Sequence, residues 1–418
     1  MPKNRLSGRD SDVVKTIPYV SLFSGGMGLD LGLERHGFQS VVCNDTDEAS
    51  AKTIRLNRPE VPVVEASVET ISRRMLTALL GSDPRGIPLI AGGPPCQSFS
   101  IIGRRRGTSE RNGEMIFQFL RIVDELRPSA FLMENVRGLH NMPLKPGRKA
   151  DGSLLREIIC QFEHLGYRLD CFLVNSANYG APQIRERLVC IGNRHGLIAQ
   201  FPAPNFSNRP VDGLPPFRTL RDAIGNGFID PDPILMNFSP RKLKYLAMVP
   251  PGGNWRSLPT NMQREAMGKQ YYLKGGRSSS WRKLSWDFPS PTIHTMPNHA
   301  ATSMCHPVEL RALTVGECAA IQEFPPEWTF AGSPAEKYRQ VGNAVPVKLG
   351  EAIGEAVVSL LRAVGERRQI GDAAMPSRVV HLRPHVRTRQ YWKDGKALAG
   401  DFKYSPSRCD NGQQRLWS

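Results

Sequence analysis

The chain of 418 residues is 40% hydrophobic and 22% charged, which is ordinary for a globular protein and allows one large core plus at least one smaller domain. Lys and Arg number 55 against 39 Asp and Glu, and the formal net charge of +16 favours a polyanionic partner, nucleic acid before an anionic membrane. No apolar run approaches the roughly 20 residues of a membrane span, and residues 1–10 lack the apolar core of a secretory signal, so we expect no membrane partner.

A glycine-rich turn follows the first predicted strand. Residues 1–16 form a basic lead-in, and Ile17–Phe23 is short, aromatic and β-branched, as strands are. The strand leads directly into Ser24-Gly25-Gly26-Met27-Gly28. Glycines at such a place let the backbone pass close to a ligand and begin a helix whose N-terminus faces that ligand. Ordinary turn glycines would explain the pattern about as often.

An acidic segment closes the second predicted strand, Ser40–Cys43. A carboxylate at the end of the second strand of a doubly wound sheet is well placed to bind ribose hydroxyls, and Asp45 has this position. Alternatively, Asp45 or Asp47 caps the helix that begins at Glu48. A third strand is expected within Val61–Glu65.

The fourth predicted strand, Leu89–Ala91, stops at two glycines and two prolines that present Cys96 on a stiff turn. A basic loop, residues 101–107, follows at once. A thiol held at the carboxyl end of a strand beside a cationic loop suggests a nucleophile that meets an anionic polymer. A buried structural cysteine in a tight turn is the alternative of equal weight.

An acid is expected at the end of the next strand. The apolar spacing of Met115–Leu126 predicts a helix, and the following strand, Ala130–Met133, leads to Glu134. We expect this strand to lie beside the one that carries Cys96, so that acid and thiol share one edge of the sheet. The alternative for Glu134 is a strand-end residue that caps a helix.

Two arginines stand close together on an extended segment. After a helix at 154–165 and a strand at 167–174, the segment Gln183-Ile184-Arg185-Glu186-Arg187 precedes a strand at 188–192. Side chains at i and i+2 of an extended chain point the same way. Arg185 and Arg187 could therefore grip a phosphate or a polar ring edge, or make surface ion pairs.

The pattern changes from about residue 201 to residue 306, where proline and glycine are dense and basic residues alternate with aromatic ones. This composition predicts a separate, loop-rich domain for binding. Beyond it we expect a helix over Glu309–Phe324, a polar turn over Tyr338–Pro346 and a helix over Val347–Val364, with a basic tail from about residue 366.

The eight cysteines are scattered without closely spaced pairs, which argues against a disulfide framework and against a structural zinc site. His299, Cys305 and His306 come nearest to a metal cluster, but no second half of a site accompanies them. The expected compartment is a reducing cytoplasm.

Taken together, six segments in this order resemble the DNA cytosine-5 methyltransferases of bacterial restriction–modification systems. They are Phe23–Gly28, Gly93–Ser100, Glu134–Val136, Gln183–Arg187, Arg311–Pro325 and Gly342–Pro346. The glycine segment alone is a weak signal, whereas Pro94-Pro95-Cys96-Gln97 and Glu134-Asn135-Val136 are specific. The resemblance covers most of the chain from about residue 19 to residue 362.

The resemblance implies an α/β fold, a Rossmann-like S-adenosylmethionine-dependent methyltransferase with a mixed, mostly parallel sheet and a smaller, loop-rich target-recognition domain. The boundaries we expect are a basic lead-in at 1–16, a catalytic and cofactor-binding domain at 17–200, a target-recognition domain at 201–306, a return segment that completes the catalytic domain at 307–365, and a basic tail at 366–418.

The chemistry that the resemblance implies needs these residue types. A thiolate, here Cys96, attacks carbon 6 of cytosine and makes carbon 5 nucleophilic. Glu134 supplies an acid at ring nitrogen 3, and partial burial would raise the pKa of its carboxyl group for that task. Arg185 helps to hold the cytosine, while Arg187 braces the site. The sulfonium of S-adenosylmethionine drives methyl transfer without a metal, and the sequence does not identify the base that removes the carbon-5 proton.

By resemblance, the cofactor lies against the glycine turn and is closed in by a late turn of the chain. The residues implied in this contact are Phe23, Gly25, Gly26, Gly28, Asp45, Asn343 and Val345. One position departs from the family, since Ser67 stands where an Asp usually contacts the adenine amino group. Glu65 or Glu69 could take over that contact.

The target base is inaccessible within a duplex, so the reaction requires base flipping. We expect the loop after Cys96 to close over the flipped nucleotide and residues 201–306 to read the sequence in the major groove. The expected enzyme is a monomer that acts on double-stranded DNA in the bacterial cytoplasm, bound to the nucleoid through its substrate. It would protect that DNA from a cognate restriction endonuclease, a second candidate partner. A tRNA cytosine-5 methyltransferase and a catalytically silent DNA-binding regulator are the alternatives.

Overall fold

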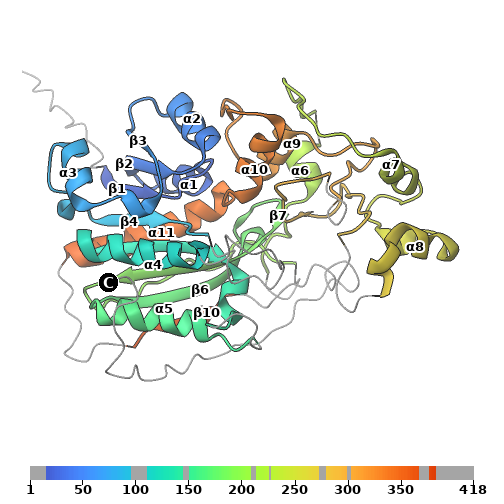
Figure 1. Ribbon diagram of the computed structural model, residues 1–418. Helices are drawn as coiled ribbons and strands as arrows, with labels where there is room; N and C mark the ends of the chain where they lie inside the picture. Colours follow the sequence, from blue (N-terminus) through green and yellow to red (C-terminus); the bar gives the residue numbers. More distant parts are fainter. Residues whose placement is uncertain are drawn as a thin grey trace, which may run out of the picture.

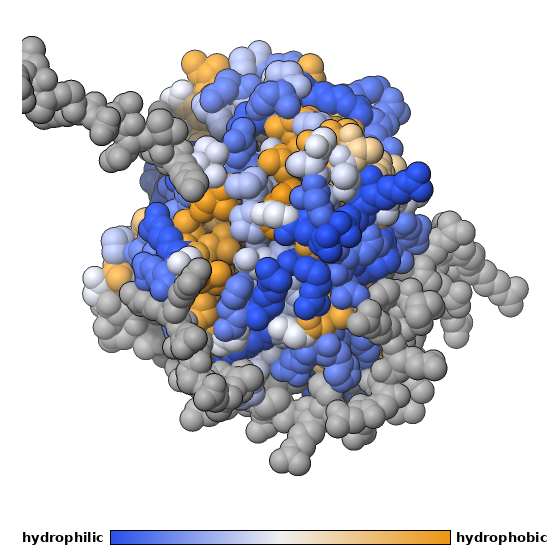
Figure 2. Space-filling model, turned by 90° about the vertical axis from the view of Figure 1, so that its left-hand side faces the viewer, coloured by the Kyte–Doolittle hydropathy of each residue, from blue (hydrophilic) through white to orange (hydrophobic). Residues whose placement is uncertain are grey.

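The computed structural model describes residues 16–95, 111–144, 150–208, 213–225, 227–272, 279–298, 303–366 and 376–382. Cys96, the basic loop at 101–107 and most of the C-terminal tail lie outside the described residues. Figure 1 shows a sheet with helices on both faces and, to its right, a second region that contains the helices α7 and α8. Figure 2, which faces the side of α3, shows a mostly hydrophilic surface with smaller apolar areas.

Within the described part of the chain, eight strands form one sheet in the order β10-β6-β8-β5-β4-β1-β2-β3. The strands are β1 (Ile17–Leu22), β2 (Phe38–Asp45), β3 (Val63–Glu65), β4 (Leu89–Gly92), β5 (Ala130–Val136), β6 (Arg168–Asn175), β8 (Glu186–Asn193) and β10 (Arg378–His381). Neighbouring strands run parallel except for β8, which is antiparallel to both β5 and β6. The predicted mixed, mostly parallel sheet is therefore confirmed, as is the pairing of β4 with β5.

Helices cover both faces of this sheet. They are α1 (Gly28–Glu34), α2 (Glu48–Asn57), α3 (Arg73–Leu80), α4 (Arg111–Leu126), α5 (Ser153–His164) and α11 (Val347–Gly365). One hydrophobic core joins α3, α4 and α5 to one face, and a second core joins α1 and α11 to the other. Figure 1 shows α4 and α5 in front of the sheet and α11 behind it.

The short strand β4 shows why successive residues of these strands are all apolar. Ile90 packs into the core under α4 and α5, while Leu89 and Ala91 pack into the opposite core under α11. Both faces of a largely parallel sheet are buried, so successive residues are apolar instead of alternating with polar ones. The predicted apolar face of α4 is likewise buried, at Ile116, Phe119, Leu120 and Val123.

The second region contains α7 (Pro240–Leu246) and α8 (Thr260–Met267), and α6 (Leu220–Ile224) precedes them in the chain. A separate core there includes Tyr245, Leu246, Trp255 and Trp281. The helix α6 does not join this core and packs instead with α9 (Val315–Ile321) and α10 (Pro334–Asn343). A two-stranded parallel sheet of β7 (Gln183–Ile184) and β9 (Ser290–Pro291) links the two regions.

Two expectations about secondary structure were wrong after residue 306, and one strand there was not predicted. The helix expected over Glu309–Phe324 is only α9, because Thr314 caps its N-terminus in a capping box with Glu317. The polar turn expected over Tyr338–Pro346 is mostly the helix α10, which begins after Ser333 with a second capping box. The tail beyond residue 366 contributes β10, which extends the sheet beside β6.

The scattered cysteines predicted no disulfide framework, and the sheet brings one pair of them together. Cys171 on β6 and Cys190 on β8 are directly opposed neighbours, with Cα atoms 4.1 Å apart, and they form a disulfide. The pairing could not be predicted from the sequence, because the two cysteines are 19 residues apart and only the register of β6 against β8 places them opposite one another. Within the described residues, none of the helices combines the length and the apolar character that a membrane span needs.

Candidate active site

A cavity of about 580 Å³ opens at the carboxyl ends of β1, β2, β4 and β5. The chain order of the strands reverses between β1 and β4, and ligands of open α/β sheets bind at such a switch point. Nine residues predicted for the site line this cavity, namely Phe23, Gly25, Gly26, Gly28, Asp45, Glu134, Arg185, Asn343 and Val345. Cys96 lies outside the described residues, but Pro95, directly before it, lines the cavity.

The turn between β1 and α1 forms one wall. Its backbone takes positive φ angles at Phe23 and Gly25, and the Gly25 amide donates a hydrogen bond to the Asp45 carboxylate, N to Oδ2 2.8 Å. Gly28 is required for close packing, because a Cβ atom there would stand 2.3 Å from the Val345 carbonyl oxygen. The glycine turn and the turn after α10 therefore meet through backbone contacts.

The acids after β2 have two different positions: Asp47 caps a helix, and Asp45 faces the cavity. Asp47 caps α2, accepting a hydrogen bond from the Ser50 amide at 3.1 Å. Asp45 lines the cavity, and its Oδ1 accepts a hydrogen bond from the Asp47 amide at 2.9 Å. Burial raises the pKa of Asp45, opposed by hydrogen bonds from the Asp47 and Gly25 amides. A carboxylate has about four acceptor positions, so Asp45 keeps acceptor capacity for a ligand hydroxyl.

The three residues considered for an adenine contact are not among the lining of this cavity. The Ser67 side chain accepts a hydrogen bond from the Glu69 amide, which begins a short 3-10 helix. Glu65 forms an ion pair with Arg55 instead, N to O 2.8 Å. The structure thus offers no support for Ser67, Glu65 or Glu69 in this contact.

Glu134 lies inside β5, not after it, and is 9% exposed. Its Oε1 forms an ion pair with Arg187 Nε on the neighbouring strand β8 at 2.7 Å. Burial raises the pKa of Glu134, and the positive charges of Arg187 and Arg185 oppose this shift. Burial thus favours the protonated form of the Glu134 carboxyl group, and the ion pair with Arg187 favours the charged form.

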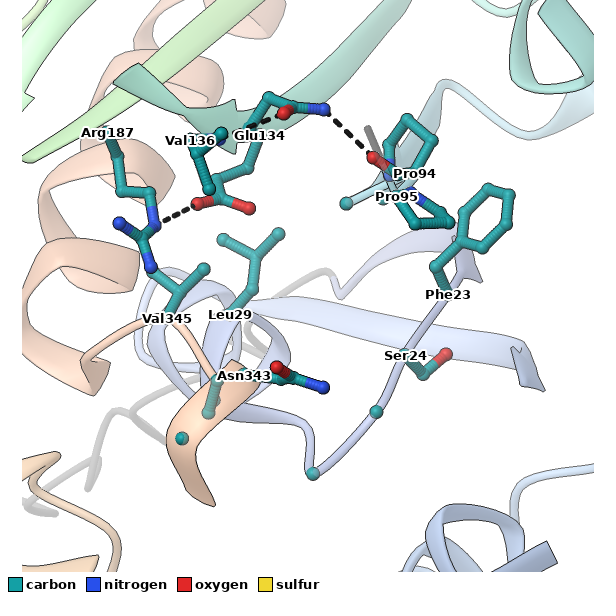
Figure 3. Close-up of a pocket in the computed structure, with 18 of the residues that line it drawn as sticks. Phe23, Ser24, Leu29, Pro94, Pro95, Glu134, Val136, Arg187, Asn343 and Val345 are labelled. Atoms are coloured by element: carbon teal, nitrogen blue, oxygen red, sulfur yellow. Dashed lines mark hydrogen bonds and ion pairs between the residues drawn. The ribbon is translucent and has the colours of Figure 1, made fainter. Parts of the chain in front are cut away.

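The turn that leads to Cys96 rests against this acid. A Cβ atom on Gly93 would lie 3.2 Å from Glu134 Oε2, and Asn135 Nδ2 donates to the Pro94 carbonyl at 2.8 Å. Figure 3 shows Pro94 and Pro95 on one side of Glu134 and Arg187 on the other. In the same view Asn343 lies across the pocket from Glu134, and Val345 lies below Arg187.

The two arginines both line the cavity, as expected for residues two apart, but they differ in their partners. Arg187 pairs with Glu134. Arg185 is 2% exposed and donates to three backbone carbonyls, those of Ile293, Gly342 and Asn343. Burial and the nearby Arg187 lower the pKa of Arg185, opposed by Glu134.

The model of the family described as C-5 cytosine-specific DNA methylase matches residues 17–359. The chain belongs to this family. That membership makes the cavity a candidate methylase active site and agrees with the resemblance seen in the sequence.

The proteins similar to this chain include Type II methyltransferases. M.Eco47II of Escherichia coli is 39% identical and aligns over 83% of this chain and 80% of its own length. M.Sau96I of Staphylococcus aureus is 37% identical, over 81% of this chain and 75% of its own length. The crystal structure of a candidate DNA modification methyltransferase from an E. coli prophage shares the fold, with a TM-score of 0.58 and 24% identity over 83% of this chain and all of its own.

The sequence did not predict one wall of the methylase cavity. Thr292, Ile293, His294 and Thr295, which follow β9, also line it. Burial, with Arg282 and Arg185 nearby, lowers the pKa of His294 to about 4, so its imidazole is neutral at pH 7. The only local signal was a β-branched pair after Pro291. Its place in the site depends on the pairing of β9 with β7.

Proposed function

We propose that this methylase transfers a methyl group from S-adenosylmethionine to carbon 5 of a cytosine within a specific double-stranded DNA sequence. The reaction would proceed through a covalent adduct of Cys96 with a flipped base. The observation that carries this proposal is the contact between Glu134 and the turn that ends at Pro95, which lies within the cavity that contains the predicted cofactor residues.

The lining of the cavity fits the cofactor. The volume of about 580 Å³ falls in the usual range for small-molecule sites. Asp45 has acceptor capacity for the ribose hydroxyls, while Phe23, Asn343 and Val345 would enclose the remainder of the molecule. S-adenosylmethionine, when bound, supplies a methyl group on a positively charged sulfur.

The residues of the chain would then activate the cytosine. The Cys96 thiolate adds to carbon 6, the ring electrons move to carbon 5, and Glu134 donates a proton or a hydrogen bond to nitrogen 3. After carbon 5 has accepted the methyl group, its proton leaves to a base or water. The electrons of the broken carbon 5–hydrogen bond re-form the carbon 5–carbon 6 double bond, and the bond from carbon 6 to sulfur breaks to release the thiolate. A proton that Glu134 gave to nitrogen 3 returns to Glu134 in the same step.

The geometry favours a different division of work between the arginines than the sequence suggested. Arg187 touches the carboxylate of Glu134 and would orient it toward the base. Arg185 makes three hydrogen bonds to backbone carbonyls through Nη1 and Nη2, so Arg185 would act on the cytosine through the segments that it holds. We therefore propose Arg187 as the arginine nearest to the target ring.

The net charge of +16 supports binding to a DNA polyanion, and chemistry on a base in a duplex requires flipping. We infer that residues 201–306 read the target sequence. Because similar proteins are Type II methyltransferases, we propose that methylation protects bacterial DNA from a cognate restriction endonuclease. The enzyme would act as a monomer on DNA in the cytoplasm.

The direct test is methyl transfer from labelled S-adenosylmethionine to duplexes that present cytosine in many sequence contexts, with tRNA as a parallel substrate. We expect label on one set of related duplex sites and none on tRNA. Label on tRNA alone would indicate an RNA enzyme, and no label on either would favour a DNA-binding regulator.

The role of residues 201–306 has its own test, an exchange of this segment for that of M.Sau96I or another similar protein. The exchange should transfer the partner's site preference. An unchanged preference would place sequence recognition elsewhere in the chain.

A further inference from the structure

Two segments that line the cavity lie directly against one another, although one follows β9 and the other ends α10. A Cβ atom on Gly342 would stand 2.6 Å from the Thr295 amide nitrogen and 2.7 Å from the His294 carbonyl carbon. No side chain larger than hydrogen fits there without displacing backbone. The segment 292–295, which we call the target wall, therefore rests on the segment 341–345, which we call the cofactor wall.

Arg185 holds these two walls together. Its Nη1 donates to the Ile293 carbonyl of the target wall at 3.2 Å, and its Nη2 donates to the Gly342 carbonyl of the cofactor wall at 2.8 Å. The same Nη2 lies 3.2 Å from the Asn343 carbonyl oxygen. These last carbonyls belong to the C-terminal end of α10, where a positive charge is favourable. The planar fork of a guanidinium can reach both walls at once, which a single ammonium cannot.

A second route joins the same two walls through a pair of glutamines. Gln183 Oε1 accepts from the Ile293 amide at 2.9 Å, and Gln183 Nε2 donates to Gln322 Oε1 at 2.8 Å. Gln322 Nε2 in turn donates to the Val341 carbonyl at 2.6 Å and to the Ala344 carbonyl at 3.1 Å. Both glutamine side chains are 0% exposed.

We propose that Gln183, Arg185 and Gln322 form a positioning network that couples binding of the cofactor on one wall to binding of the target nucleotide on the other. The proposal rests on the proposed function, since it takes the two ligands from there. In this proposal Arg185 positions the two walls through its hydrogen bonds to their backbone carbonyls and does not contact the reacting atoms.

The physical basis is the cost of breaking buried hydrogen bonds. A buried donor or acceptor that loses its partner cannot turn to water, so the two walls are constrained to move together. A ligand that orders one wall thereby orders the other, and the second ligand then binds with less loss of conformational freedom. By linkage, each ligand must strengthen the other by the same factor.

The test measures that factor. The affinity for S-adenosylhomocysteine, which cannot react, is determined with and without a duplex that the wild-type protein has been shown to methylate. We expect the duplex to tighten cofactor binding by about 5-fold or more in the wild type. Arg185→Lys breaks the first route, and Gln183→Met and Gln322→Met each break the second, so each single variant should lower the factor below that of the wild type. The double variant Arg185→Lys with Gln183→Met breaks both routes, and its factor should fall toward 1.

A matched control removes a neighbouring ion pair that belongs to neither route. Arg218 pairs with Glu323, N to O 2.9 Å, and Glu323 follows Gln322 directly. Arg218→Gln should keep the coupling factor of the wild type, because neither route passes through it.

Folded variants of all three network residues with the wild-type factor would overturn the proposal, and so would a wild type that methylates DNA but shows no coupling. If one variant does not fold, as judged by thermal unfolding, the other two decide. Failure of the proposed function is distinguishable, because the wild type would then methylate no duplex at all, which removes both proposals together.

Discussion

The side of the cavity proposed to hold the cofactor is built mainly from backbone, whereas the side proposed to hold the target base is built from long charged side chains. On the cofactor side, Gly25 and Gly28 bring turns together, and Asp45 is held by two amide donors. On the target side, Glu134 and Arg187 are buried as a pair that depends on two neighbouring strands. The first arrangement would position a ligand by shape, and the second holds two opposite charges that are largely buried.

This difference predicts separable defects. A change on the cofactor side should weaken binding of S-adenosylmethionine and leave the chemistry of the bound complex largely intact. A change on the target side should slow the chemistry and leave cofactor binding intact. Substitutions can therefore test whether the two sides are distinct in function as well as in construction.

The largest effect is expected for Cys96→Ser. A serine hydroxyl is a far weaker nucleophile at neutral pH, so methyl transfer should fall by at least about 10⁴-fold. The affinity for S-adenosylhomocysteine, measured by calorimetry, should stay within about 2-fold of wild type, because the defect would be one of chemistry alone. Methylation that survives this change would remove Cys96 from its proposed role.

Glu134→Gln should lower kcat by about 10² to 10⁴-fold, because the amide cannot deliver a proton to ring nitrogen 3. The KM for S-adenosylmethionine should change little. The measurement is steady-state kinetics on an unmethylated duplex that contains a site modified by the wild type. A variant with wild-type kcat would contradict the role of Glu134 as an acid.

Arg187→Gln should lower kcat by about 10- to 100-fold, the range for loss of a charge-assisted hydrogen bond. Arg187 lowers the pKa of Glu134, so its removal should raise that pKa further. Glu134 then stays protonated to higher pH, so the alkaline fall of kcat/KM should occur at higher pH than in the wild type. Arg187→Lys keeps the charge and should leave the alkaline fall in place, so an equal shift in both variants would contradict this account.

Asp45→Asn acts on the cofactor side and should raise the KM for S-adenosylmethionine by about 10-fold, the worth of one hydrogen bond to a ribose hydroxyl. The kcat at saturating cofactor should remain near that of wild type. A variant in which kcat falls and KM is unchanged would place Asp45 in the chemistry and erase the distinction between the two sides.

The last prediction concerns stability rather than either side of the cavity. Burial raises the pKa of Glu323 from an ordinary 4.5 to about 7, against the opposing charges of Arg218 and Lys348. Between these values the folded protein holds a proton that the unfolded chain has lost, so stability falls as the pH rises from 4.5 to 7. Glu323→Gln should lose less stability than wild type between pH 5 and pH 8, by up to about 3 kcal/mol in urea unfolding. Identical losses would show that Glu323 titrates normally.

The cofactor side was predictable from sequence because its signals are local. Glycines after a strand, an acid after the next strand and Asn343 in a recognisable segment all line the cavity as expected. The target side was predicted only in part. Glu134 and the two arginines were found, but the partner of each arginine was not, since burial and strand register decide which group a long side chain reaches.

The segment 292–295 was missed because it enters the site through the pairing of β9 with β7, which lie more than 100 residues apart in the chain. The same limit explains β10, whose only local signal is a short β-branched pair in a basic tail. The helix α10 could have been predicted, since Ser333, Pro334 and Glu336 form a capping signature in the sequence itself.

The measurement that tests the central claim most directly is covalent trapping with a duplex that contains 5-fluorocytosine at the methylated position. Fluorine leaves no proton to remove from carbon 5, so the adduct cannot resolve after methyl transfer. We predict a complex that survives denaturation, carries labelled methyl and maps by peptide sequencing to Cys96. Label transferred to the ordinary duplex but no adduct, or an adduct on another residue, would contradict the account.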